Sequence, residues 1–452
     1  MARNTSLSLR NAVIYQIFTR NYKGGTFQAV EADLDRIQAL GADIIYLLPV
    51  QPSGEVHRKG SMGSPYAIRD YRIPDPVQGT MEDFKALSSA IHARGMKLMI
   101  DVVYNHTSPD SWLAENHPEW FFHKADGSLG NRIGDWWDVV DLDYTKKDLW
   151  RYQIDTLKMW AEYVDGFRCD VAPMVPLDFW LEARAKVEEV RPGCIWLAES
   201  VEPAFIAMNR RAGIETLSDS ELYQAFDICY DYDLYDSMKN AMTGKGSLSH
   251  YLARMDRQET MYPSNYCKLR CLENHDRNRA AAMLPEERVL RNWTAWTFFA
   301  KGTAMIYAGE EFENTHHPTL FEHDPVNFET GRDLSSLMRS LSRIKKNPLF
   351  RNTSMHAEAV GSSDDVILAV QEANETAAPA QEVCQRRQSG SSLPPAGRRF
   401  SPWICRTAPI PMPSTAAPWR CLKSCCPSAG SLSSFCCDRF QMVPIPAAET
   451  IR

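Results

Sequence analysis

The chain has no long hydrophobic run, no block of basic residues and no signal-peptide core. No apolar stretch approaches the roughly 18 residues that a membrane-spanning helix needs, so we expect no membrane partner. The formal net charge is −7 and the basic residues are scattered, which argues against nucleic acid as a partner. The first residues, Met1 to Arg10, are polar, and we expect a cytoplasmic protein.

Cysteine is scarce over most of the chain. Up to Gln371 there are five cysteines, and none has the spacing of a metal site. Several lie in stretches that we expect to be buried strands, where a free thiol behaves as a small apolar residue. The five cysteines up to Gln371 are Cys169, Cys194, Cys229, Cys267 and Cys271.

Short apolar runs alternate with helical patterns along the chain. One helix is expected from Phe27 to Leu40, and Thr80 with Asp83 forms a capping-box pattern before another. This order favours parallel strands joined by helical crossovers. Eight such units close into a (β/α)8 TIM barrel with its site at the C-terminal strand ends. The expected strands are 13–19, 44–48, 98–103, 166–170, 195–199, 225–230, 269–273 and 304–307.

The alternation stops after the third expected strand. Residues 107–148 are rich in Trp, Asp, Asn and Gly, and this stretch is too long for a simple turn. We interpret it as a small inserted subdomain B that leans over the site. Residues 1–106 then supply barrel strands one to three, 149–355 supply the remainder of the barrel, and 356–371 begin a C-terminal β-domain.

The composition changes abruptly in the last 81 residues, 372–452. This stretch holds seven of the 12 cysteines and 11 of the 27 prolines but no tyrosine and no histidine. A disulfide module is disfavoured because nothing else indicates export, and a zinc module would need regular ligand spacing. A third interpretation, out-of-frame translation from near Asn374, is favoured. We therefore expect a truncated C-terminal domain followed by an aberrant, disordered tail.

Charged side chains follow several of the expected strands. Arg168 and Asp170 are two residues apart, so on a strand both point to the same side. We expect the guanidinium to keep this carboxylate ionised, as a nucleophile at a sugar carbon requires. Glu199 and Asp276 follow two other strands. Singly, these three carboxylates are better explained as an ion-pair partner, a strand-end acid and a helix cap.

Their joint occurrence points to chemistry, because the strand ends of one barrel converge on one mouth. Two carboxylates in different environments can divide the work of glycosidic cleavage. We predict Asp170 as the nucleophile. Glu199 is the predicted acid/base, because it lacks an adjacent cation and follows an apolar strand. Asp276 is expected to hold sugar hydroxyls and to favour a distorted, oxocarbenium-like ring.

Four segments resemble the signature regions of glycoside hydrolase family 13, the α-amylase family. The resemblance extends from about Val13 to Gln371, and it implies the same three catalytic roles. It also implies that Arg168, His106 and His275 surround the first sugar subsite and that Tyr66 stacks on that sugar. Taken alone, the two histidines are as readily explained by local contacts, and Tyr66 by a place in the core. The four segments are 101–106, 166–170, 196–199 and 272–276.

The resemblance raises the question of calcium. Many family members bind Ca²⁺ through an asparagine of the first region and an aspartate of the inserted subdomain, and Asn105 and Asp141 match these oxygen donors. Residues 171–174 lack the Lys-His pair whose histidine carbonyl completes that site in many amylases. The expected chemistry requires no cofactor. Whether the protein holds a structural calcium ion is a separate question, which the sequence leaves open.

The resemblance implies a retaining α-glycosidase that hydrolyses α-glucans or maltooligosaccharides, as in starch and maltodextrin degradation, through a covalent glycosyl-aspartate. One alternative is a glucanotransferase or a sucrose- or trehalose-directed transglycosylase or isomerase, which shares this intermediate. A non-catalytic carbohydrate-binding homologue is disfavoured, because such proteins usually lose the carboxylates. Another alternative is an inactive or misfolded product of a frameshifted gene, with an apolar barrel face left exposed.

Overall fold

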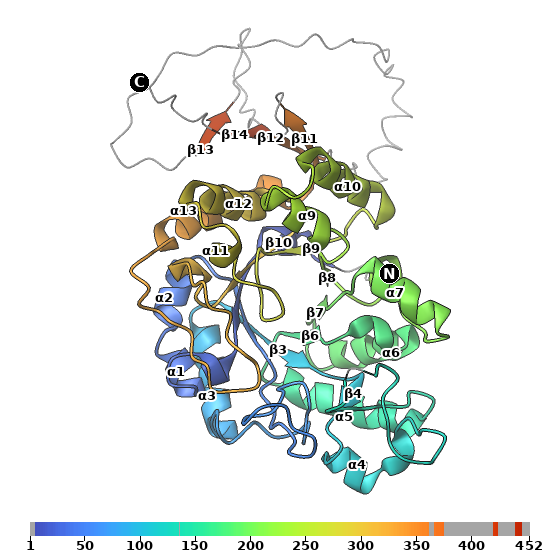
Figure 1. Ribbon diagram of the computed structural model, residues 1–452. Helices are drawn as coiled ribbons and strands as arrows, with labels where there is room; N and C mark the ends of the chain where they lie inside the picture. The colour runs from blue at the N-terminus through green and yellow to red at the C-terminus, as the bar shows by residue number, and fades with distance from the viewer. Residues whose placement is uncertain (1–4, 135, 361–365, 375–418, 424–438, 445–452) are drawn as a thin grey trace, which may run out of the picture.

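A closed barrel of eight parallel strands forms the centre of the computed structural model, with helices around it (Figure 1). The structure describes residues 5–134, 136–360, 366–374, 419–423 and 439–444. Around the ring the strands run in the order β1, β10, β9, β8, β7, β6, β3, β2. The predicted (β/α)8 barrel is therefore confirmed. Its strands are β1 (Val13–Ile17), β2 (Ile44–Leu47), β3 (Lys97–Val102), β6 (Gly166–Cys169), β7 (Ile195–Ala198), β8 (Ile228–Tyr230), β9 (Lys268–Arg270) and β10 (Thr303–Tyr307).

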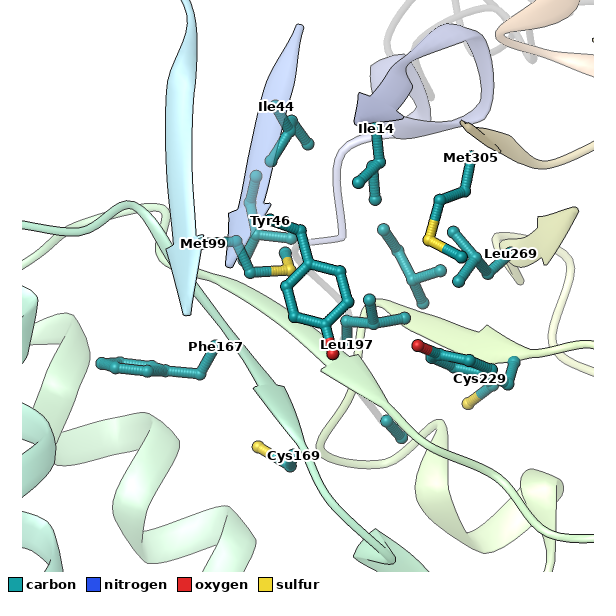
Figure 2. Packing of buried hydrophobic residues seen from close by; sticks show 14 of the residues in the cluster. Ile14, Ile44, Tyr46, Met99, Phe167, Cys169, Leu197, Cys229, Leu269 and Met305 are labelled. Atoms are coloured by element: carbon teal, nitrogen blue, oxygen red, sulfur yellow. The ribbon is translucent and has the colours of Figure 1, made fainter. Parts of the chain in front are cut away.

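The barrel strands are apolar almost throughout because both of their faces are covered. Side chains alternate between the barrel interior and the surrounding helices, so nearly every strand residue is buried. Ile14, Ile44 and Met305 pack near one another, whereas Phe167 is turned toward a surrounding helix (Figure 2). The interior is thus a packed core that holds the C-terminal strand ends in place.

The helices follow the expected pattern with one difference. Thr80 and Asp83 form the predicted capping box at the start of α3 (Met81–Ala93). The stretch expected as one helix is two, α1 (Phe27–Glu31) and α2 (Leu34–Ala39). The break lies at Asp33, whose backbone leaves the helical conformation (φ −105°, ψ 1°). Its carboxylate accepts hydrogen bonds from Arg36 and Tyr22. Periodicity alone does not reveal this polar anchor.

The remaining helices alternate with the barrel strands or extend beyond them. Within the part of the chain that the structure describes, no helix has both the length and the apolarity needed to cross a membrane. These helices are α4 (Trp112–Asn116), α5 (Lys147–Ala161), α6 (Leu177–Glu188), α7 (Pro203–Arg211), α8 (Asp219–Leu222), α9 (Tyr235–Met242), α10 (Leu248–Met261), α11 (Ala280–Met283), α12 (Glu287–Phe299) and α13 (Ser335–Lys345).

A small two-stranded sheet interrupts the barrel between β3 and α5. Its strands, β4 (His106–Thr107) and β5 (Val140–Asp141), run antiparallel and pair His106 with Asp141. This pairing anchors both ends of the inserted stretch next to the third barrel strand. His106, which was predicted to bind sugar, is consequently held at the base of the insertion.

A four-stranded antiparallel sheet, ordered β11-β12-β14-β13, follows the barrel. Its strands are β11 (Thr353–Val360), β12 (Val366–Ala373), β13 (Trp419–Lys423) and β14 (Arg439–Pro444). The sheet joins the barrel through α10, where His356 Nδ1 lies 3.0 Å from Asp256 Oδ2. Two segments of the expected aberrant tail are thus strands. Most of 372–452 lies outside the described residues, so an aberrant, disordered tail stays a prediction.

Candidate active site

The predicted site residues come together at the C-terminal ends of the barrel strands. Asp170 and Glu199 directly follow β6 and β7, and Asp276 follows β9 after a short turn. The parallel register of β3 and β6 places Asp101 beside Arg168 inside the barrel. Regular pairing of neighbouring strands therefore builds one side of the site.

The guanidinium of Arg168 is the centre of the site and is fully buried. Its Nη1 donates to Asp101 Oδ1 at 2.8 Å and to Asp170 Oδ1 at 2.8 Å. Its Nη2 lies 3.1 Å from Glu199 Oε1. Asp170 and Glu199 thus contact different nitrogens of one guanidinium.

The two oxygens of Asp170 have different surroundings. Oδ1 is held by Arg168, whereas the buried Oδ2 has no hydrogen-bond partner among the described residues. On the side of Oδ2 lies His106, whose Nε2 is 3.8 Å away. One oxygen is therefore anchored, and the other is available to attack an electrophile.

Electrostatics in this cluster correct one expectation from the sequence. Burial raises the pKa of Asp170 well above its ordinary value, the charge of Glu199 raises it further, and Arg168 only partly offsets both. Burial also raises the pKa of Asp101 to about 6, although Arg168 lowers it. The guanidinium does not by itself keep Asp170 ionised. Because Asp101 and Asp170 share one cation, these two carboxyl groups titrate together.

A strained turn after Asp170 orients Glu199. Val171 adopts a left-handed conformation (φ 39°, ψ 42°), which is unfavourable for a β-branched residue. This conformation directs the Val171 N–H to Glu199 Oε2 at 2.7 Å. Val171, the first residue of the segment 171–174 that lacks the Lys-His pair, thus positions the predicted acid/base.

A hydrogen-bonded chain connects the opposite side of the site to Arg168. The amide nitrogen of Gln16 lies 3.1 Å from His275 Nδ1, and His275 Nε2 lies 2.6 Å from the Tyr66 hydroxyl. An amide nitrogen only donates, so His275 Nδ1 accepts and Nε2 carries the hydrogen. Burial and the charge of Arg168 lower the pKa of His275, which keeps the ring neutral. Tyr66 then donates to Asp101 Oδ2 at 3.1 Å.

His106 and Asp276 complete the mouth. Burial and the ammonium of Lys59 lower the pKa of His106 to about 3, so its imidazole is neutral. Asp276 Oδ2 lies 3.2 Å from His275 Nε2, and its side chain is 37% exposed. Asp276 therefore faces the open mouth above the ring of His275, which stacks on Tyr66 at 5.6 Å.

The family of alpha-amylase catalytic domains matches residues 13–388. The chain belongs to the alpha-amylase family. An alpha-amylase from Lactobacillus plantarum is similar in structure, with a TM-score of 0.79 and 49% identity over 81% of this chain and 87% of that chain. A noncanonic maltogenic alpha-amylase, AmyB, from Thermotoga neapolitana has a TM-score of 0.73 and 36% identity over 81% of this chain and 84% of that chain.

Transferases also occur among the similar proteins of the alpha-amylase family. An alpha-1,4-glucan:maltose-1-phosphate maltosyltransferase from Rhodospirillum rubrum is 33% identical over 211 residues. The match covers 42% of this chain and 30% of that relative. The region of this chain that matches therefore spans less than a third of the maltosyltransferase's length.

Sequence reasoning assigned no role to three residues of this alpha-amylase family site, which are Asp101, Tyr46 and Gln16. Asp101 is fully buried and accepts from Arg168, Tyr66 and Tyr46, whose hydroxyl lies 2.6 Å from Oδ2. Gln16 sets the tautomer of His275. A detectable signal existed, since Asp101 and Gln16 are polar residues within otherwise apolar strands that end at the barrel mouth.

The residues matched to the family's calcium site do not form a suitable set of ligands. Asp141 Oδ2 accepts from the Arg132 N–H at 2.8 Å and lies 3.4 Å from Arg132 Nη1. Asp141 Oδ1 is buried without a hydrogen-bond partner in the described part of the chain, and Asn105 directs its amide nitrogen to His106. A guanidinium beside the carboxylate repels a divalent cation, and Ca²⁺ requires six to eight oxygen ligands. No described group of three or more His, Cys, Asp or Glu residues could hold a metal.

Proposed function

We propose that this chain is a retaining α-glycosidase that hydrolyses α-glucosidic bonds in α-glucans or maltooligosaccharides. The observation that supports this most is the guanidinium of Arg168, which contacts both Asp170 and Glu199 while Asp170 Oδ2 has no hydrogen-bond partner among the described residues. Two carboxyl groups, one anchored as a nucleophile and one oriented as an acid, are what retaining cleavage requires. We also propose a cytoplasmic location, as expected from the sequence.

In the first step, Asp170 Oδ2 attacks the anomeric carbon while Glu199 gives its proton to the leaving glycosidic oxygen. This forms a covalent glycosyl ester on Asp170 and leaves Glu199 ionised. In the second step, Glu199 removes a proton from water, which attacks the same carbon and releases Asp170. Each cycle restores both carboxyl groups and retains the anomeric configuration.

The other residues hold the sugar during these steps. The half-buried ring of Tyr66 offers a flat surface for one face of a pyranose. Asp276 accepts hydrogen bonds from sugar hydroxyls and stabilises positive charge at the anomeric centre. The neutral imidazole of His106 can donate one hydrogen bond from Nε2 to a sugar hydroxyl. His275 directs its Nε2 hydrogen to the Tyr66 hydroxyl and so holds the ring of Tyr66 in place. These groups favour the transition state when their contacts strengthen as the ring flattens.

A second candidate is glycosyl transfer through the same ester. The rings of Trp136, from the inserted stretch, and Phe205, on α7, lie 6.5 Å apart at an angle of 23°. Trp136 also lies 5.4 Å from the ring of His106. Aromatic surfaces at this place can hold a sugar that competes with water for the ester. Sucrose and trehalose are the alternative substrates to include in such a test.

The test is product analysis on maltotriose with early anomeric detection by NMR. Hydrolysis with retention gives shorter sugars whose new reducing end is first seen as the α-anomer. Products longer than maltotriose would establish transfer as the main reaction. A new reducing end that first forms as the β-anomer would contradict the double-displacement mechanism. No cleavage of maltotriose, longer maltooligosaccharides, sucrose or trehalose by folded protein would refute the proposal.

A further inference from the structure

The loop between β2 and α3 is tied to two other segments at the barrel mouth. Lys59 Nζ forms an ion pair of 2.6 Å with Asp138 Oδ1 in the inserted stretch. On the other side, the Met62 N–H donates to the Phe321 carbonyl at 2.9 Å in the segment after β10. The Ser61 N–H donates to the Glu322 carboxylate at 3.1 Å. Three segments from different parts of the chain are therefore joined into one strap, which we define as residues 59–62, 137–138 and 321–322.

The strap is tightly packed. Gly60 has a φ of +63°, and a Cβ there would lie 2.5 Å from the Phe321 carbonyl oxygen. The Lys59 ammonium also lies 5.4 Å from the centre of the Trp137 ring and 5.8 Å from that of Phe321. An ion pair, main-chain hydrogen bonds and cation–π contacts together hold the loop in one position.

The strap lies beside the site. The ring of Trp136, the residue before Trp137, lies 5.4 Å from the ring of His106, whose Nε2 is 3.8 Å from Asp170 Oδ2. The charge of Lys59 also contributes to the lowered pKa of His106. Asp138, its partner, is almost completely buried. A carboxylate that is buried and paired in this way is not free to move away when an oligosaccharide arrives.

The order of the barrel strands, taken with the proposed role of Glu199, indicates which end of the substrate the strap faces. In the ring of eight strands, β2 lies opposite β8 and β1 lies opposite β7. The leaving sugar departs past Glu199, which follows β7, so acceptor sugars occupy the side of β7 and β8. The strap is centred on residues 59–62, which follow β2 and so stand opposite β8, and the segments after β10 and β3 flank this centre. The centre therefore stands on the side of the donor sugars, toward the non-reducing end of the glucan, whereas Trp136, next to the strap in the insertion, lies against Phe205 on the acceptor side.

We propose that the strap closes the donor end of the site, so that the enzyme acts from the non-reducing end and releases one short product of fixed length. This inference rests on the proposed glycosidase function. A glucan can then enter only with its chain end toward the strap, whereas internal bonds would need room for further sugars beyond it. The strap residues determine specificity and do not take part in bond cleavage.

A pair of maltoheptaosides tests the inference with the unchanged protein. Both carry a chromophore at the reducing end, and one also carries a benzylidene group on its non-reducing glucose; the chromophore-bearing products of each are separated and quantified by chromatography without a coupling enzyme. We expect cleavage of the free substrate, with one dominant short product, and at least a 50-fold slower reaction of the blocked one. Equal rates would overturn the inference and leave the proposed function intact. If neither is cleaved, and maltotriose is also inert, the proposed function fails and the inference with it.

Variants test whether the strap itself causes the preference. Lys59→Met combined with Glu322→Gln removes the ion pair with Asp138 and the charge that accepts from the Ser61 N–H, while the side-chain volumes stay similar. We expect the ratio of blocked to free cleavage to rise at least tenfold and longer products to appear. Lys186→Met is the matched control, because among the described residues this exposed lysine on α6 forms its one ion pair with Glu189, which is nearby. An unchanged ratio in a folded double variant would contradict the role of the strap.

Discussion

Replacing Asp101 by Asn should move the acid limb of the pH–activity profile to lower pH. Asp101 and Asp170 each lie 2.8 Å from the same nitrogen of Arg168, so their carboxylates are no more than about 6 Å apart. The charge of Asp101 raises the pKa of Asp170, and the substitution removes that charge. It also leaves the guanidinium with fewer competing carboxylates. Both effects favour the ionised form of Asp170, so the nucleophile stays active in more acidic solution.

The size of this shift follows from Coulomb's law. At an effective dielectric constant of about 20, two unit charges about 6 Å apart interact by about 3 kcal/mol, which corresponds to about two pKa units. Asp101 itself has a pKa of about 6, so its charge fades in acid and the effective shift is smaller. We expect the acid limb of kcat/KM to move down by about one unit.

The substitution also has a cost in stability. Asp101 accepts hydrogen bonds from Arg168, Tyr46 and Tyr66, and an Asn cannot accept from all three with both of its terminal atoms. Breaking a fully buried ion pair typically costs about 3–5 kcal/mol, so the melting temperature should fall.

The assay is kcat/KM on maltotriose from acidic to neutral pH, below the melting temperature of both proteins. Asp148→Asn is the matched control, because Asp148 is exposed on α5 and, in the part of the chain that the structure describes, pairs with Arg151 alone. This control should leave the profile unchanged. An acid limb that stays in place or moves upward in folded Asp101→Asn protein would refute the electrostatic reasoning.

Three other predictions follow from the same geometry. Asp170→Asn should lower kcat by about 10³-fold or more with an unchanged circular dichroism spectrum, because the nucleophile is lost at nearly constant volume, and near-parent activity would contradict its role. Tyr66→Phe should lower kcat/KM about tenfold, because the ring remains while the hydroxyl contacts to His275 and Asp101 are lost. Tyr66→Ala removes the ring as well, so it should also raise KM through the loss of stacking on the sugar. EDTA should leave the melting temperature and activity unchanged, whereas Arg132→Ala should lower the melting temperature. A large loss on chelation, reversed by Ca²⁺, would contradict the interpretation of Arg132 as the cation beside Asp141.

Much of the fold could be predicted because local patterns carry it. The eight barrel strands are continuous apolar runs between helical segments, and all eight were expected near their observed positions. The predicted helix from Phe27 to Leu40 was wrong in its continuity, since Asp33 binds Arg36 and Tyr22 and breaks the helix. Such an anchor depends on a side chain that comes close only after the chain has folded.

The site shows the same division. The sequence by itself determined which side chains stand at the ends of parallel strands, because strand direction and side-chain alternation are local properties; Arg168, Asp170 and Glu199 follow from them. Only the tertiary structure decided that Asp101 shares the guanidinium, that burial raises the pKa of Asp170, and that Lys59 reaches Asp138. Those outcomes depend on distances between remote segments and on the exclusion of water, which exist only once the barrel has closed.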